Sequence, residues 1–135
     1  MKTNELKATD LMIGDWLKHY NGTPMQVTKI TTEHFACAEN RGMNCWEYNN
    51  KYEPIPLTPE ILEKSGILYE KQSYYYVIED NKDLECTYYI QQVQEDWAIG
   101  VDIGAYDCSV FARIKYVHEL QHALKLCGID KEIII

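Results

Sequence analysis

The chain has 135 residues, of which 46% are hydrophobic and 25% are charged, and its formal net charge is −8. This length suits one compact domain or two very small modules, and the globular balance of the composition excludes a largely disordered chain. The 13 basic residues form no stripe among the 21 acidic ones, so neither nucleic acid nor an anionic membrane is expected as a partner.

Short strands are predicted over the first part of the chain. LMIGDWLKHY is followed by the turn signal NGTP and by the alternating segment MQVTKITT, and HFACA and NCWEY come next. Strands of about five residues joined by tight turns are typical of a small curled sheet or barrel. We therefore predict an SH3-like β module over residues 1–57.

A short helix is predicted over residues 59–65. Thr58 is a good N-cap, Pro59 suits the first helical position, and Gly66 is the expected stop. This helix opens the second part of the chain, residues 58–135, which either shares one core with the first part or has its own.

Antiparallel strands are predicted between residues 67 and 114. SYYYVI runs to the polar turn EDNKD, LECTYYIQQVQ returns, and DWAIGVDIG and CSVFARI follow. Their alternation gives one apolar and one mixed face, as expected for a sheet that a helix covers on one side.

The segment YVHELQHALKLCG is the most helix-like in the chain. Its apolar residues recur at helical spacing and form one stripe, and Gly128 is the natural stop. The predicted fold class is therefore α+β: an N-terminal SH3-like small β-barrel module, a short helix, and an antiparallel sheet packed by a C-terminal helix.

This last helix contains HELQH, which matches the H-E-x-x-H motif of zinc peptidases. In that interpretation His118 and His122 bind the metal and Glu119 acts as the general base. However, the two histidines lie opposite the apolar stripe, which predicts that both point to solvent. The extended form of the motif is also missing, because Lys125 and Gly128 replace its glycine and third histidine. We expect solvent-facing histidines, and a minimal zinc hydrolase is the alternative.

The eleven tyrosines are a second candidate feature. Tyr74, Tyr75 and Tyr76 fall on one predicted strand, and Tyr88 and Tyr89 fall on the next. The principal interpretation is aromatic packing across the hairpin. The alternative is an exposed aromatic patch that binds a peptide or a partner protein, since tyrosine is enriched at interfaces.

Other motifs of enzymes are missing from the chain. It has no glycine-rich phosphate loop, no nucleophile elbow and no calcium loop, so no cofactor is expected. The tail IDKEIII predicts either a final strand or an apolar patch for self-association, which makes a homo-oligomer one possibility.

The chain also shows no sign of secretion. Its start has no apolar run of signal-peptide length, and no later run is long enough to span a bilayer, so we expect a cytoplasmic protein. The cysteines number five and include no C-x-x-C pair. Such an odd count predicts reduced thiols that pack as small hydrophobic side chains, with a reactive or metal-binding cysteine as the alternative.

Three segments carry a resemblance that spans nearly the whole chain: LMIGDWL…NGTPMQVTKI, YEPIPLTPEILEKSGI and IKYVHELQHALKLCGI. Together they resemble a family of small uncharacterised bacterial proteins associated with prophages and mobile elements of gut anaerobes. The most specific piece is the run Pro-Ile-Pro-Leu-Thr before the short helix. The resemblance implies a bacterial or phage cytoplasmic setting and no known activity. It also implies that the positions of Glu119 and His122 need not be Glu and His.

These observations favour a non-enzymatic module that binds protein or peptide. The reasons are the lack of a convincing catalytic constellation, the acidic charge and the abundant tyrosine. Two alternatives stay open. One is the minimal zinc hydrolase, and the other is an acidic phage-encoded inhibitor that mimics nucleic acid, which requires carboxylates clustered on one face at phosphate-like spacing.

Overall fold

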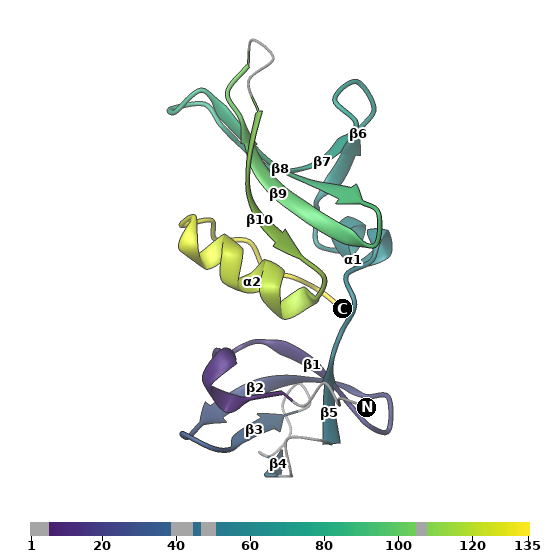
Figure 1. The fold of residues 1–135 in the computed structure, drawn as a ribbon, viewed down its shortest axis with the longest axis vertical. Coiled ribbons are helices and arrows are strands. Elements are labelled where there is room, and N and C mark those ends of the chain that lie inside the picture. Colours follow the sequence, from purple (N-terminus) through teal and green to yellow (C-terminus); the bar gives the residue numbers. More distant parts are fainter. Residues whose placement is uncertain (1–5, 39–44, 47–50, 105–107) are drawn as a thin grey trace. The chain divides into compact units, whose positions relative to one another are not determined.

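The computed structural model describes residues 6–38, 51–104 and 108–135, and the backbone of residues 45–46. Over these residues the chain has an α+β fold with two antiparallel sheets and two α-helices (Figure 1). This confirms the α+β part of the predicted fold class. The chain divides into two compact units: unit 1 contains residues 1–56 and 116–122, and unit 2 contains residues 57–115 and 123–135.

Unit 1 contains a five-stranded sheet with the order β4-β3-β2-β1-β5. Its elements are η1 (Ala8–Asp10), β1 (Trp16–His19), β2 (Pro24–Ile30), β3 (Phe35–Ala38), β4 (Cys45–Trp46) and β5 (Tyr52–Pro54). The first four strands form a meander. A tight turn at Asn21-Gly22 joins β1 to β2, and Gly22 has the positive φ of 93° that this turn requires. β5 then pairs antiparallel with β1.

The core of unit 1 comes from the inward residues of these strands. Leu17, Val27 and Phe35 are almost completely buried and pack in one cluster with η1. The ring of Tyr52 on β5 lies 5.2 Å from that of Phe35. These buried side chains give unit 1 its own apolar centre.

Unit 2 begins with the predicted helix. α1 spans Pro59–Lys64, and its N-cap Thr58 accepts a hydrogen bond from the backbone N–H of Ile61 at 3.4 Å. Gly66 follows the helix with φ 80°. The capping signals of the sequence were sufficient here because they act within a few residues of one another.

The second sheet has the order β10-β9-β8-β7-β6, so each strand pairs with the one before it in the chain. Its strands are β6 (Leu68–Glu70), β7 (Tyr75–Asn81), β8 (Cys86–Val93), β9 (Asp96–Asp102) and β10 (Cys108–Ile114). Strand β9, which lies between β10 and β8, is buried from Trp97 to Gly100. The indole N–H of Trp97 donates a hydrogen bond to the carbonyl of Leu57, which ties the sheet to the residue before the α1 cap.

The last helix, α2, spans Val117–Leu126 and is divided between the units, with residues 117–122 in unit 1 and the rest in unit 2. Its start is fixed by a hydrogen bond from the Val117 N–H to the Ile55 carbonyl at 2.8 Å. Gly128 ends it with φ 71°. The stripe residues Val117, Leu120 and Leu124 are buried, as the apolar repeat predicted.

The cysteines and the tail are only partly as expected. Cys37 and Cys86 are buried thiols, but Cys108 is exposed at the start of β10, so the prediction of core thiols is wrong for that residue. Cys45 has no described side chain. The tail forms no strand, and its Ile134 N–H donates to the Ser65 hydroxyl oxygen at 2.8 Å. Within the described part of the chain, no helix is both long and apolar enough to cross a membrane.

Candidate functional site

The histidines of HELQH do not point to solvent. His118 is only 8% exposed, and the side chain of His122 is 25% exposed. The predicted solvent-facing pair is therefore wrong. The prediction assumed that α2 packs through its apolar stripe alone, whereas its polar face contacts residues 14–16 at the start of β1.

Asp15 is the main partner of this polar face. Its carboxylate is 1% exposed, and its Oδ2 lies 2.6 Å from His122 Nε2. The same oxygen accepts the backbone N–H of Met12 at 2.8 Å. A buried carboxylate is costly unless it is hydrogen-bonded or paired, so His122 provides the contact that lets Asp15 sit in the interior.

Gln121 holds the residues on either side of Asp15. Its side-chain amide donates to the Gly14 carbonyl at 2.9 Å, and its carbonyl accepts the Trp16 N–H at 2.9 Å. The same loop is fixed from β2, where the Val27 N–H donates to the Asp15 carbonyl at 2.9 Å. Gln121 and His122 therefore join α2 to the entry of β1.

Glu119 has a local role at the start of α2. Its Oε1 accepts the backbone N–H of Tyr116 at 3.0 Å. An acidic residue that reaches back from the first turn in this way satisfies a donor that the helix leaves unpaired and also favours the positive end of the helix dipole. The position that the zinc-peptidase motif assigns to a general base is used here to cap the helix.

His118 lies between two other rings. It stacks on Tyr116 with a centroid distance of 6.0 Å and meets His122 edge-on at 5.6 Å. Burial lowers the pKa of His118, and the nearby carboxylate of Asp15 opposes this effect only in part. Its Nδ1 is buried and has no hydrogen-bond partner among the described residues. Burial therefore favours the neutral imidazole, which packs between the rings of Tyr116 and His122.

These contacts bear on the metal alternative. Asp15 is the nearest new candidate for a third ligand, and no motif in the sequence pointed to it. Yet no group of three or more His, Cys, Asp or Glu side chains in the described residues is arranged so that it could hold a metal ion. His118, His122 and Glu119 are thus brought together in space, but in contacts that serve packing and capping.

The five tyrosines of the predicted patch separate onto different surfaces. Tyr75 and Tyr89 are buried and stack with a centroid distance of 4.5 Å, which confirms aromatic packing across the hairpin. Tyr74 is 71% exposed, whereas Tyr76 and Tyr88 are half-buried. One exposed patch of all five is therefore wrong, because successive residues of a strand point to opposite faces.

The buried pair has a polar anchor. The Tyr75 hydroxyl donates a hydrogen bond to Asp102 Oδ2 at 2.7 Å. This bond, followed by one from the Gly104 N–H, lowers the pKa of Asp102. Burial, followed by the same bond to Asp102, raises the pKa of Tyr75. These rings stabilise the sheet and are not available to a ligand.

A second set of aromatic rings leads from the core to the surface. Trp97 is 2% exposed, and its ring lies 5.8 Å from that of Tyr76. Tyr76 in turn meets the ring of Tyr69 edge-on at 5.0 Å, and Tyr69 is 47% exposed. Tyr69 was missing from the predicted patch, because only the pairing of β6 with β7 places it opposite Tyr76.

Tyr74 is held in an unusual backbone conformation. It follows the turn after β6 with φ 61°, and its carbonyl accepts a hydrogen bond from the Gln91 side chain at 3.1 Å. A left-handed conformation costs a bulky residue roughly 1 kcal/mol that glycine would avoid. The turn therefore presents an exposed ring at a position where glycine would fit better. We call Tyr69, Tyr74 and Tyr76, the tyrosines of the β6–β7 hairpin that are exposed or half-buried, the hairpin surface.

Searches against protein-family models, curated proteins and solved structures find no match to this chain.

Proposed function

We propose that this protein is a non-enzymatic module that binds protein or peptide, of phage or mobile-element origin, and that the β6–β7 hairpin contacts the partner. The observation that carries the proposal is the hairpin surface, where Tyr69 and Tyr74 are 47% and 71% exposed. Tyrosine supplies a large contact area at a small cost in conformational entropy, and it is enriched at binding hot spots.

The strain at Tyr74 supports this assignment. Residues in sparsely populated backbone conformations persist where the surrounding structure holds them, and they cluster at functional sites. Here the Gln91 side chain and the turn hydrogen bonds to the Glu70 carbonyl hold Tyr74 in place. A binding role explains why the exposed position carries an aromatic ring.

The finer architecture is part of the same proposal. We propose that unit 1 is an SH3-like small barrel. Its support is the strand order, in which a four-stranded meander is followed by a strand that returns to β1. Small barrels of this kind commonly act as adaptors for peptides, which agrees with a binding role for the chain as a whole.

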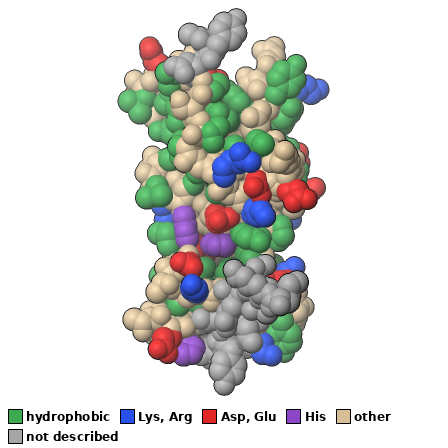
Figure 2. All heavy atoms as spheres, in the orientation of Figure 1, with side chains coloured by type: hydrophobic (Ala, Val, Ile, Leu, Met, Phe, Trp, Pro, Cys, Tyr) green, Lys and Arg blue, Asp and Glu red, His purple; other side chains and the backbone are tan. Residues whose placement is uncertain are grey.

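The contacts of HELQH give the hydrolase less support than the hairpin surface gives to binding. A hydrolase requires Glu119 to act on a metal-bound water, but its carboxylate caps α2. The acidic mimic requires a uniform array of carboxylates. On the face shown in Figure 2, acidic and basic side chains alternate with hydrophobic ones.

A displayed library of extended peptides tests the proposal. We expect wild-type protein to select peptides whose affinity falls about tenfold or more in Tyr74→Ala and Tyr69→Ala, the loss typical of an aromatic hot spot. Tyr20→Ala is the matched control, because Tyr20 is 69% exposed in unit 1. Selected peptides that bind the hairpin variants as tightly as the wild type would overturn the proposal.

A further inference from the structure

The last strand of the second sheet has an outer edge that no other described strand covers. β10 stands at the end of the strand order and pairs only with β9 among the described residues (Figure 1). A strand in this position presents a row of backbone N–H and C=O groups that a further strand can pair with. The opposite edge of the sheet is β6, which has three residues, whereas β10 has seven. The outer edge of β10 is therefore the longer template for pairing.

This edge is also apolar at its middle. Val110 is 53% exposed and Phe111 is 48% exposed. The register with β9 shifts between Val110 and Ala112, which places a bulge at Phe111. A bulge often protects an edge from pairing because it re-aims a side chain, but this one leaves two neighbouring apolar side chains in contact with water. Pairing along β10 would remove part of this apolar surface from water.

The two ends of β10 differ in charge. The sequence from Cys108 to Ile114 has one charged residue, Arg113, which is exposed near the end of the strand. At the start of the strand, Cys108 is the Cα partner of Asp102 on β9. β10 therefore has a cation near its last residue and a carboxylate beside its first.

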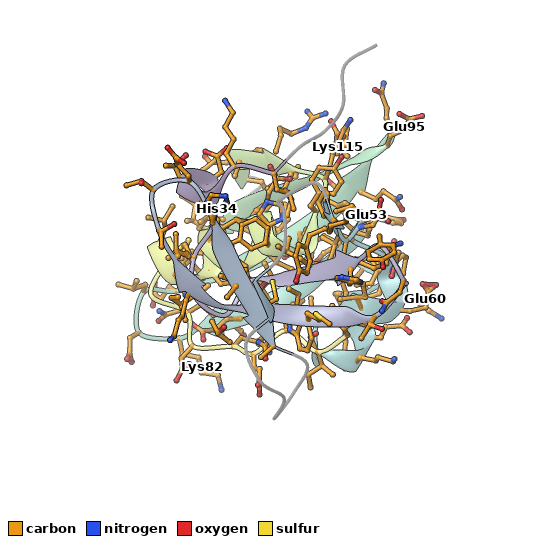
Figure 3. All side chains as sticks on the ribbon, turned by 90° about the horizontal axis from the view of Figure 1, so that it is seen from below. His34, Glu53, Glu60, Lys82, Glu95 and Lys115 are labelled. Atoms are coloured by element: carbon orange, nitrogen blue, oxygen red, sulfur yellow. The ribbon has the colours of Figure 1, made fainter. Side chains whose placement is uncertain are left out.

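Lys115, which directly follows β10, has acidic neighbours in its own chain. Lys115 and Glu95 lie at the same end of this sheet (Figure 3), and the Lys115 ammonium is 3.8 Å from Asp96 Oδ1. Its charge is thus partly balanced within the chain, and Arg113 gives the strand itself a positive end.

We propose that β10 pairs antiparallel with β10 of a second copy of this chain. Antiparallel pairing about a two-fold axis brings Arg113 of each copy to the end of the other strand where Asp102 lies, so opposite charges approach each other twice. Val110 and Phe111 are at the middle of the strand, so full overlap places them beside the same residues of the second copy. Aromatic and β-branched side chains form favourable pairs across strands. Parallel pairing would instead bring the two Arg113 side chains together.

The net charge of the chain does not prevent this contact. The formal net charge is −8, which opposes association at long range, but salt at 0.1 M screens charges beyond about 10 Å. The strand itself has no carboxylate from Cys108 to Ile114, so the contact surface is not acidic. The joined sheet would carry one hairpin surface at each end. The inference does not depend on the proposed function, but two hairpin surfaces would bind a repeated partner more tightly than one.

Sedimentation velocity of the full chain over a wide range of concentrations tests the inference. We expect a dimer whose dissociation constant rises about tenfold or more in Val110→Lys and Phe111→Lys, because each substitution is present twice and puts like charges at the edge. Arg113→Glu should raise it roughly threefold to tenfold. Leu84→Lys is the matched control and should leave it unchanged, because Leu84 is 67% exposed in the turn between β7 and β8.

Amide hydrogen exchange identifies the strand that makes the contact. Exchange in residues 108–114 should slow as the protein concentration rises, because pairing gives the outward N–H groups of β10 new acceptors. The other edge strand, β6, is the internal control, and its exchange should not depend on concentration. This measurement uses the wild-type chain, so it tests the inference even where a lysine variant fails to fold.

A wild-type chain that stays monomeric at every concentration would overturn the inference. A dimer that persists unchanged in Val110→Lys and Phe111→Lys, or one that leaves the exchange of β10 unchanged, would also overturn it, because another surface would then join the copies. A monomer in which an extended peptide protects β10 would show that a peptide, and not a second copy, extends this edge.

Discussion

Asp15 is the residue that explains the polar face of α2. Its carboxylate is 1% exposed and lies 2.6 Å from His122 Nε2, although 107 residues separate the two in the chain. The sequence offers no sign of this pairing, because an Asp after a glycine ordinarily indicates a solvated turn. The prediction that His118 and His122 point to solvent failed for this reason: the apolar spacing gave the helix and its buried stripe correctly, but it did not show that residues 14–16 pack on the polar side.

Gly100 is required by the stacking of the buried tyrosines. A Cβ at this position would lie 2.6 Å from both the Ser109 carbonyl oxygen and the Tyr89 hydroxyl oxygen. Because one neighbour is backbone, it cannot move aside easily. We expect Gly100→Ala to lower the free energy of unfolding by about 2–3 kcal/mol in urea titrations.

The matched control for this prediction is Gly104→Ala. A Cβ at Gly104 meets nothing within 4 Å, so only its backbone φ of 84° opposes the substitution. Its cost should be about 1 kcal/mol. A smaller loss in Gly100→Ala than in Gly104→Ala would show that β10 does not approach Gly100 as closely as described.

His118 makes stability depend on pH. Burial lowers its pKa from the ordinary value of 6.5 in the folded protein, so the unfolded chain binds the proton more tightly. Its contribution is therefore complete above about pH 6.5 and is lost as the pH falls toward the lower folded pKa. Urea unfolding at a series of pH values should show a weaker decline on acidification in His118→Gln than in wild type.

The control for the pH experiment is His34→Gln, because His34 is exposed. Its profile shows what the replacement of an exposed histidine by glutamine does to the measurement. A His118→Gln profile that parallels the wild type would mean that the imidazole titrates alike in the folded and unfolded chains.

At the scale of the element, the sequence predicted well the features that depend on neighbouring residues, and it predicted poorly those that depend on pairing between strands. Thr58, Pro59 and Gly66 place α1 within one residue of its observed end, because caps act over a single turn. Tyr75, Tyr76, Tyr88 and Tyr89 were assigned to strands correctly, whereas Tyr74 lies in the turn before β7. Which of them are exposed depended on the register between strands and on the turn that holds Tyr74, and one strand alone does not contain that information.

The start of α2 gives a direct test of the capping role of Glu119. Glu119→Ala removes the acceptor for the Tyr116 N–H and should lower the free energy of unfolding by about 1 kcal/mol. Glu119→Gln keeps a carbonyl oxygen in the same place and should cost less. Urea titrations of both variants against wild type measure the difference. Equal stability of the alanine variant and the wild type would remove the capping role.

At the scale of the whole molecule, chain order and spatial grouping disagree. The predicted division at residue 57 separates the first sheet from everything after it. The structure groups residues 116–122 with that sheet, through His122 on Asp15 and Gln121 on the backbone of residues 14 and 16. Hydrophobic patterns reveal the elements, but they do not reveal which module a C-terminal helix joins, since that depends on contacts between distant residues.

This grouping predicts that residues 1–57 alone do not form a stable module. The fragment would leave the Asp15 carboxylate without His122 and the Trp16 N–H without Gln121, and a buried polar group that loses its partner costs about 1–3 kcal/mol. A small module has little stability to spare. We expect no cooperative thermal transition and poorly dispersed amide signals in the NMR spectrum of the fragment.

Joining residues 116–128 to the fragment through a flexible glycine–serine linker should restore the cooperative transition and the dispersed signals, because Gln121 and His122 are then present again. A fragment 1–57 that unfolds cooperatively without this segment would show that the first sheet holds the entry to β1 by itself, and that α2 is an accessory to unit 1.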